Sequence, residues 1–283
     1  MNQTFDFNRW RLLIAKHGYE QGKKYLLSLV AIAALLLIWF VFVLFANPYE
    51  PLPDGAQFGT YYVGLFLVGC IYASLLFSDL ASRPRGIDYL SLPASHLEKL
   101  LCALFYGVLI FFLAYTIVFY IVELPMIRVA RAIAYAHWLK TAHPKEIFNA
   151  GETINVFVMP RRPAGAPNAF FYILLSYFAV QAAFILGSVY FPKFSFIKTV
   201  VTLLLIGLVY VFLVDTVVGW IMPEGRYYHA FTAYNFHGPN GYEDGKVVTL
   251  PEWFHDLLSI IVRYAFAPIF WITTYFRLKE KEI

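Results

Sequence analysis

Ionisable side chains are scarce in this sequence, and each suggestive spacing can be tested against the chemistry that it would support. The segment Gly18–Lys24, GYEQGKK, approaches the glycine-rich loop that binds nucleotide phosphates. It is one residue too short, it lacks the Ser or Thr that would hold magnesium, and no strand precedes it. We therefore expect that this chain does not hydrolyse ATP itself.

Histidines and cysteines offer no sharp ligand spacing. No pair of histidines matches a metal-binding pattern such as H-E-x-x-H, and no serine lies in a G-x-S-x-G turn. Cys70 and Cys102 both lie inside apolar runs and predict neither a disulfide framework nor a metal site. We expect no metal and no catalytic residue here. A membrane-embedded enzyme is kept as an alternative, and it would use five histidines between the expected spans: His137, His143, His229, His237 and His255.

Polar residues inside the apolar runs are few. Asp215 lies about two turns before the end of one run, and Arg263 about two turns into the next. Charges at such depth are costly unless paired or hydrated, so we expect Asp215 and Arg263 to face each other or a shared polar cavity. Gln181 is expected to hydrogen-bond between helices, and Glu123 is expected at the membrane interface.

The segment Asp88–Leu101, DYLSLPASHLEKLL, has more order than a plain loop between two apolar runs requires. Pro93 suits a first helical turn, and Ser95 and Glu98 have the S-x-x-E spacing of a capping box. A helix should therefore begin near Pro93–Ser95 and continue into the next apolar run. Before it, Gly86 is expected to break the preceding helix. A short amphipathic piece should follow, with Asp88 exposed beside Ile87, Tyr89, Leu90 and Leu92.

Composition identifies the elements that position these residues. The 283 residues are 60% hydrophobic and 14% charged, whereas soluble domains are about half apolar and a quarter charged. The apolar runs are about 20 residues long, enough to cross a hydrocarbon core of about 30 Å. We expect an all-α integral membrane protein, one domain over residues 1–283. Its six spans are expected at about 25–46, 59–78, 100–122, 168–190, 197–221 and 256–276, with long loops at 123–167 and 222–255.

The first 24 residues are polar and amphipathic, and they do not resemble a signal peptide. Trp10, Leu13 and Ile14 recur at helical spacing, while Arg11 and the other basic residues lie largely on the remaining face. This pattern predicts an amphipathic helix in the membrane interface, in contact with lipid, before the first span.

Lysines and arginines near the span ends predict the orientation. With six spans both termini share one side, and that side carries thirteen of these residues against eight on the other. We expect both termini in the cytoplasm. The loop containing Asp88–Leu101 is then cytoplasmic as well.

In layout and in the run YLSLPASHLEKLL, the chain resembles the permease subunits of bacterial ABC type-2 exporters. In that family an interfacial elbow helix precedes six spans, and the loop between spans two and three forms a coupling helix. The resemblance covers nearly the whole chain in layout, but its specific motif covers about fifteen residues. It implies an elbow helix at Trp10, Arg11, Leu13 and Ile14. It also implies ATPase-coupling residues at Asp88, Tyr89, Leu90, Leu92, Pro93, Ser95, His96 and Glu98.

The resemblance implies an assembly in the bacterial inner membrane. Two permease chains, identical or paired with a second permease, would dock two separate ATP-binding subunits, which would hold the ATP and magnesium. This chain would hold no cofactor, and nothing in the sequence indicates nucleic acid as a partner. The alternative is a non-transporting assembly, sensory or regulatory subunit that binds partner proteins. The substrate cannot be read from the sequence.

Overall fold

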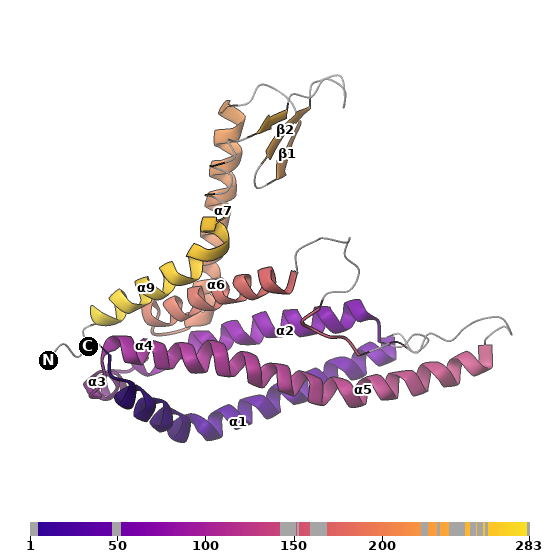
Figure 1. The fold of residues 1–283 in the computed structure, drawn as a ribbon, viewed down its shortest axis with the longest axis horizontal. Coiled ribbons are helices and arrows are strands. Elements are labelled where there is room, and N and C mark those ends of the chain that lie inside the picture. The colour runs from indigo at the N-terminus through magenta and orange to yellow at the C-terminus, as the bar shows by residue number, and fades with distance from the viewer. Residues whose placement is uncertain are drawn as a thin grey trace.

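Long apolar helices form the body of the protein, and a computed structural model shows their arrangement (Figure 1). Within the residues that the structure describes, five helices are long and apolar enough to cross a membrane. The described residues are 5–46, 52–141, 151, 153–158, 169–221, 226–230, 233–237, 247–249, 253, 257 and 260–281.

The first two predicted spans are present as helices. α1 (Phe7–Ala46) joins the predicted amphipathic segment and the first span in one continuous helix. No proline interrupts the sequence between them, so the helical hydrogen bonds can continue. The N-terminal part of α1 nevertheless runs in a different direction from the remainder (Figure 1). α2 (Asp54–Leu75) follows and packs between α5 and α6.

The third predicted span is the longest helical stretch. It consists of α4 (His96–Leu104), a π-helix η2 (Phe105–Ile110) and α5 (Phe111–Thr141). The helix continues to Thr141, so the prediction of a loop from residue 123 onward is wrong over this stretch, although Pro125 lies inside the helix. In η2, the carbonyl of Val108 accepts a hydrogen bond from the Tyr177 hydroxyl at 3.4 Å. Such π-helical turns leave carbonyls available to other partners.

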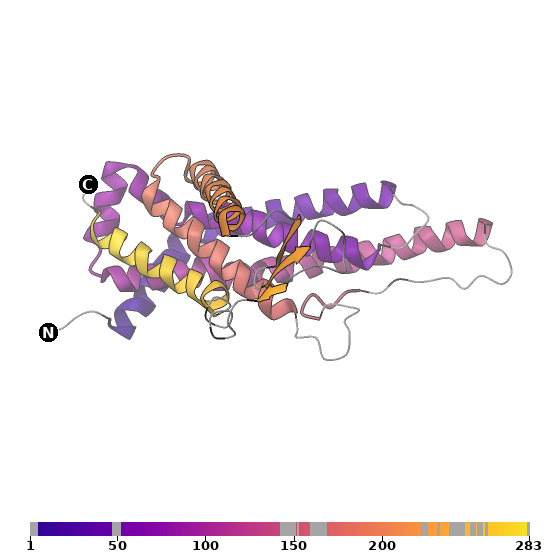
Figure 2. The ribbon, with the colours of Figure 1, turned by 90° about the horizontal axis from the view of Figure 1, so that it is seen from above.

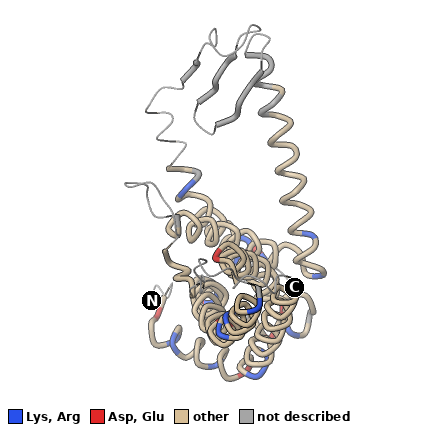
Figure 3. The backbone as a smooth tube through the Cα atoms, turned by 90° about the vertical axis from the view of Figure 1, so that its right-hand side faces the viewer, with Lys and Arg blue, Asp and Glu red and all other residues tan. Residues whose placement is uncertain are grey.

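Helices are present for the fourth and fifth predicted spans. α6 (Ala169–Tyr190) and α7 (Ser195–Ile221) are joined by a short turn in which Phe194 adopts a positive φ of 55°. Gly187 allows the start of α7 to pack closely, because a Cβ there would overlap the Thr199 side chain. Beyond this start, α7 leaves the other helices, and Val201–Leu213 is exposed on every side. Figures 1 and 3 show α7 rising clear of the helical body along a length without charged residues.

The C-terminal region is described in part. A π-helix η3 (Ile261–Ala265) leads into α9 (Phe266–Lys279), which packs along α6. The earlier residues of the predicted sixth span, 256–276, lie largely outside the described residues. Within the predicted loop 222–255, three short strands form an antiparallel sheet in the order β1-β2-β3. They are β1 (Arg226–Ala230), β2 (Ala233–His237) and β3 (Val247–Thr249).

The core lies among α1, α2, α5 and α6, and tyrosines occupy its centre. Tyr61, Tyr115 and Tyr177 are fully buried, and each hydroxyl is hydrogen-bonded. Tyr61 shares a 2.8 Å hydrogen bond with Thr116, which joins α2 to α5. Both chain ends lie at the same end of this core as α4 (Figures 1 and 2). That end also holds the segment Asp88–Leu101, which the sequence predicted to contain a helix start and an amphipathic piece.

Candidate functional site

A short helix connects α2 to α4 at the end that holds both termini. After α2, a turn of 3-10 helix, η1 (Ser78–Ala81), ends at Ser82 in an extended conformation. α3 (Arg83–Ser91) then begins, with Pro84 in its first turn, where its missing N–H costs little. The prediction that Gly86 breaks the helix is wrong. Gly86 lies inside α3 and is buried. The chain is instead interrupted before α3, at Ser82, whose backbone is extended.

α3 presents one face to solvent and the other to the protein. Tyr89 and Leu90 are half-buried, and Leu92, just beyond the helix, is half-buried as well. Asp88 is exposed, as predicted. The outward face, which we call the α3 face, is mixed in character because it carries an apolar side chain, both signs of charge and a hydroxyl. Its exposed residues are Pro84, Arg85, Ile87, Asp88 and Ser91.

Lys99 of α4 anchors the end of α3. Its side chain is only 2% exposed, and Nζ donates a hydrogen bond of 2.9 Å to the carbonyl oxygen of Leu90. The same ammonium lies 5.6 Å from the centre of the Tyr89 ring. A cation at the C-terminus of a helix satisfies a free carbonyl and interacts favourably with the partial negative charge of the helix dipole there. On its other side, Tyr89 makes an edge contact with Phe77, and burial raises the pKa of its hydroxyl.

The predicted capping box at the start of α4 is confirmed. The backbone N–H of Glu98 donates to Ser95 Oγ at 3.2 Å, and the backbone N–H of Ser95 donates to Glu98 Oε2 at 2.8 Å. Pro93 is exposed and lies two residues before the cap, so the prediction that it occupies the first helical turn is wrong. His96, the first residue of α4, is half-buried. Ser95 and Glu98 therefore fix where α4 begins.

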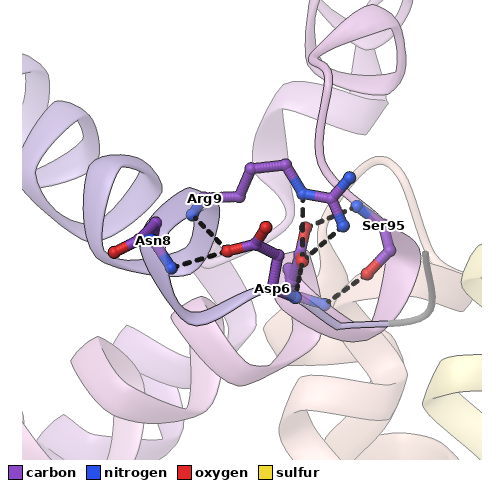
Figure 4. Close-up of polar contacts among 5 residues, drawn as sticks. Asp6, Asn8, Arg9 and Ser95 are labelled. Atoms are coloured by element: carbon purple, nitrogen blue, oxygen red, sulfur yellow. Dashed lines mark hydrogen bonds and ion pairs between the residues drawn. The ribbon is translucent and has the colours of Figure 1, made fainter.

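Glu98 also binds the start of α1, which the sequence did not predict. Its Oε1 accepts hydrogen bonds from the backbone N–H of Asp6 at 2.7 Å and from Arg9 Nη2 at 2.8 Å and Nε at 3.2 Å (Figure 4). Glu98 is 0% exposed, whereas the Arg9 side chain is 29% exposed. Glu98 consequently cannot touch a partner protein directly. It is a buried anchor that joins α4 to α1.

Further contacts hold the N-terminal part of α1 against the protein. The Asp6 carboxylate caps α1 by accepting from the backbone N–H of Asn8 at 2.8 Å. Trp10 packs edge-on against Phe105, and the Tyr106 hydroxyl donates to the carbonyl of Ile14 at 2.9 Å.

Of the four residues predicted for the elbow helix, two contact the helical segment that follows α4, and no such contact is described for the other two. Trp10 and Ile14 contact the helix after α4, Leu13 is half-buried, and Arg11 is exposed. Sequence reasoning missed Asp6 and Arg9. An Asp one residue before an amphipathic helix is a typical N-cap, and this signal could have identified Asp6.

The predicted intramembrane polar residues are not brought together in the described part of the protein. Asp215 lies in α7, but its side chain is outside the described residues, so the pairing with Arg263 stays a prediction. Arg263 is exposed, and its guanidinium lies 5.1 Å from the centre of the Tyr172 ring. The prediction for Gln181 is wrong within the described residues. Its buried amide has no hydrogen-bond partner there and packs against Gly69 of α2.

An apolar cavity of about 480 Å³ lies between α1 and α2. Small residues on α2, including Gly59, leave the space, and Trp39 closes one edge by donating from Nε1 to Thr60 Oγ1 at 2.9 Å. A site of this size and character fits part of a lipid chain rather than a polar molecule. It lies apart from α3 and the start of α4.

Neither a search for metal-binding groups nor comparison with known proteins assigns a further site. Among the described residues, no group of three or more His, Cys, Asp or Glu side chains is placed to hold a metal ion. His137 is described, and the side chains of His143, His229, His237 and His255 lie outside the described part of the chain. In comparisons with protein-family models, curated proteins and solved structures, the chain matched none.

Proposed function

We propose that this chain is the membrane permease subunit of an ATP-driven exporter of the ABC type-2 class. A separate ATP-binding subunit would hydrolyse ATP with its magnesium. The α3 face would receive the resulting movement and pass it to the spans, so that a substrate moves outward. The chain would belong to the bacterial inner membrane, with both termini in the cytoplasm.

The observation that supports this proposal is the double anchoring of α3 and α1 on the first turn of α4. Lys99 binds the end of α3, and its neighbour Glu98 binds the start of α1. A loop that merely connects two spans needs neither buried link. An input helix that must move as a unit with the membrane helices needs both.

The remaining parts of the proposal extend the arrangement that is described. The N-terminal part of α1 would act as the elbow helix in the cytoplasmic interface. η3 and α9 would be the inner part of a sixth span, added to the five helices already long enough to cross a membrane. Two copies, or one copy and a second permease, would enclose the path of the substrate.

A non-transporting assembly, sensory or regulatory subunit is the alternative function. It is favoured by the length of α5, which continues to Thr141, well beyond the predicted span. A long outward helix could serve a partner protein on the opposite side. In that case no ATPase would depend on the α3 face.

Purification from native membranes tests the proposal. We expect an ATPase to copurify with the chain and to show vanadate-sensitive ATP hydrolysis. Ile87 is 56% exposed on the α3 face, and Ile87→Gln should weaken this association about tenfold, the effect of removing one apolar interface residue.

Val129→Gln is the matched control, because Val129 is also exposed, at 47%, but lies on the outer part of α5. It should leave ATPase recovery unchanged. Stable purification without any ATPase, or equal loss of the ATPase in both variants, would refute the proposal.

A further inference from the structure

Glu123 is a buried carboxyl group to which the proposed function gives no role. It lies in α5 and is 0% exposed, which corrects the expectation that it is interfacial. Neither carboxyl oxygen has a hydrogen-bond partner in the part of the chain that the structure describes. An ionised carboxylate without a partner is too costly to bury, so a group in this position must be neutralised.

The turns of α5 on either side of Glu123 are apolar and buried. One turn before it on α5, Phe119 is fully buried and packs against Phe40 of α1 and Tyr61 of α2. One turn after it, Ile127 is 2% exposed. Glu123 is therefore one helical turn from a layer of aromatic rings contributed by α1, α2 and α5.

A short segment is fastened to the same layer. We call residues 153–158 the strap. Its Val156 is fully buried, and the Val156 carbonyl accepts a 2.6 Å hydrogen bond from the Tyr62 hydroxyl of α2. The Val156 N–H donates to the hydroxyl of Tyr120 at 3.1 Å. Because Tyr120 precedes Glu123 by three residues on α5, the strap and the carboxyl group share one face of that helix.

The complete burial of Glu123 limits which ligand can neutralise its carboxyl group. A metal ion or an organic cation would need space and further ligands, and the carboxyl group has no exposed surface and no polar partner among the described residues. The apolar cavities at α1–α2 and at α2–α6 are lined by other residues. A proton needs no space.

We propose that Glu123 is a proton-binding site whose protonation keeps the outer ends of α1, α2 and α5 and the strap closed. The closed arrangement binds the proton more tightly than an opened, hydrated one. Closure is therefore complete at low pH and is lost as the pH rises. The ratio of closed to open molecules falls by up to tenfold per pH unit over the range in which the open form is ionised and the closed form is still protonated.

Among the residues that the structure describes, the titratable groups near this layer leave Glu123 as the one whose ionisation accounts for such a change. On α5 they are Tyr115, Tyr120, Arg128 and Arg131, and the sequence of α1 from residue 26 to 46 contains none. On the outer half of α2 they are Asp54, Tyr61 and Tyr62, of which Asp54 is exposed. The described residues of the strap include no titratable side chain. None of these is a buried acid without a partner.

Hydrogen exchange of the full chain in lipid nanodiscs tests the proposal. The strap amides of the wild type should be protected at pH 6. After correction for the intrinsic rate, they should exchange at least tenfold faster at pH 9. Glu123→Gln and Glu123→Leu, which cannot ionise, should keep the protection at both pH values.

Glu20→Gln is the control, because the Glu20 side chain is 56% exposed, and it should behave as the wild type. The proposal is overturned if the neutral variants keep the pH dependence of the wild type. It is equally overturned if both lose strap protection at every pH.

Discussion

Replacing Glu98 by Gln is the sharpest perturbation of the link between α1 and α4. The glutamine keeps the size of the side chain but removes its charge and one of its two acceptor oxygens. Four hydrogen bonds end on Glu98, two from the Arg9 guanidinium and two from backbone N–H groups. Each hydrogen bond to a charged group is worth about 1.5–3 kcal/mol.

The expected loss can be worked out from the burial of the two partners. Breaking a fully buried ion pair costs about 3–5 kcal/mol. The Arg9 side chain is 29% exposed, and water can solvate part of its charge after the substitution. We therefore expect Glu98→Gln to lower the free energy of opening the start of α1 by about 2–3 kcal/mol. This corresponds to a roughly 30- to 150-fold larger open population.

Hydrogen exchange measures this opening directly, because the amide of Asp6 is itself bound to Glu98. Peptides that cover the first turns of α1 should exchange faster in Glu98→Gln by that factor. Glu20→Gln, which breaks an exposed pair with Lys16 at 3.8 Å, should change the opening free energy by less than about 0.5 kcal/mol. A double-mutant cycle with Arg9→Met should give a coupling of about 1–2 kcal/mol.

Two results would refute this reasoning. The first is a Glu98→Gln variant whose α1 amides exchange at the wild-type rate. The second is strict additivity of Arg9→Met and Glu98→Gln, because it would show that the ion pair carries no energy of its own.

Two further predictions concern close packing and the anchor of α3. Gly69→Ala should lower the thermal unfolding midpoint, since a Cβ would overlap the Gln181 amide at a cost of about 1–3 kcal/mol, whereas Gly59→Ala, with open space beside it, should have little effect. Lys99→Met should speed hydrogen exchange in α3 severalfold, because the Leu90 carbonyl loses its partner, while exchange at the start of α1 stays unchanged.

The local signals in the sequence were the ones that could be read correctly. Ser95 and Glu98 are three residues apart, and their capping box needs no information from elsewhere in the chain. The same carboxylate binds Arg9, 89 residues away, and no spacing rule connects two such positions. Exposure of a polar residue is also set by distant packing, which is why Glu123 was expected at the membrane interface and lies buried in the protein. At Gly86 the pattern predicted a break, but the extended Ser82 had already provided one.

The neighbouring positions of Glu98 and Lys99 have a mechanical consequence. Successive residues of an α-helix point about 100° apart around its axis, so the two anchors grip α4 from different sides. A sideways force on α3 would therefore act on α4 as a torque. α4, η2 and α5 form one unbroken helix, and such a rod carries rotation along its length. The wider turn of η2 is where that torsion would be absorbed or released before it reached the far end of the molecule.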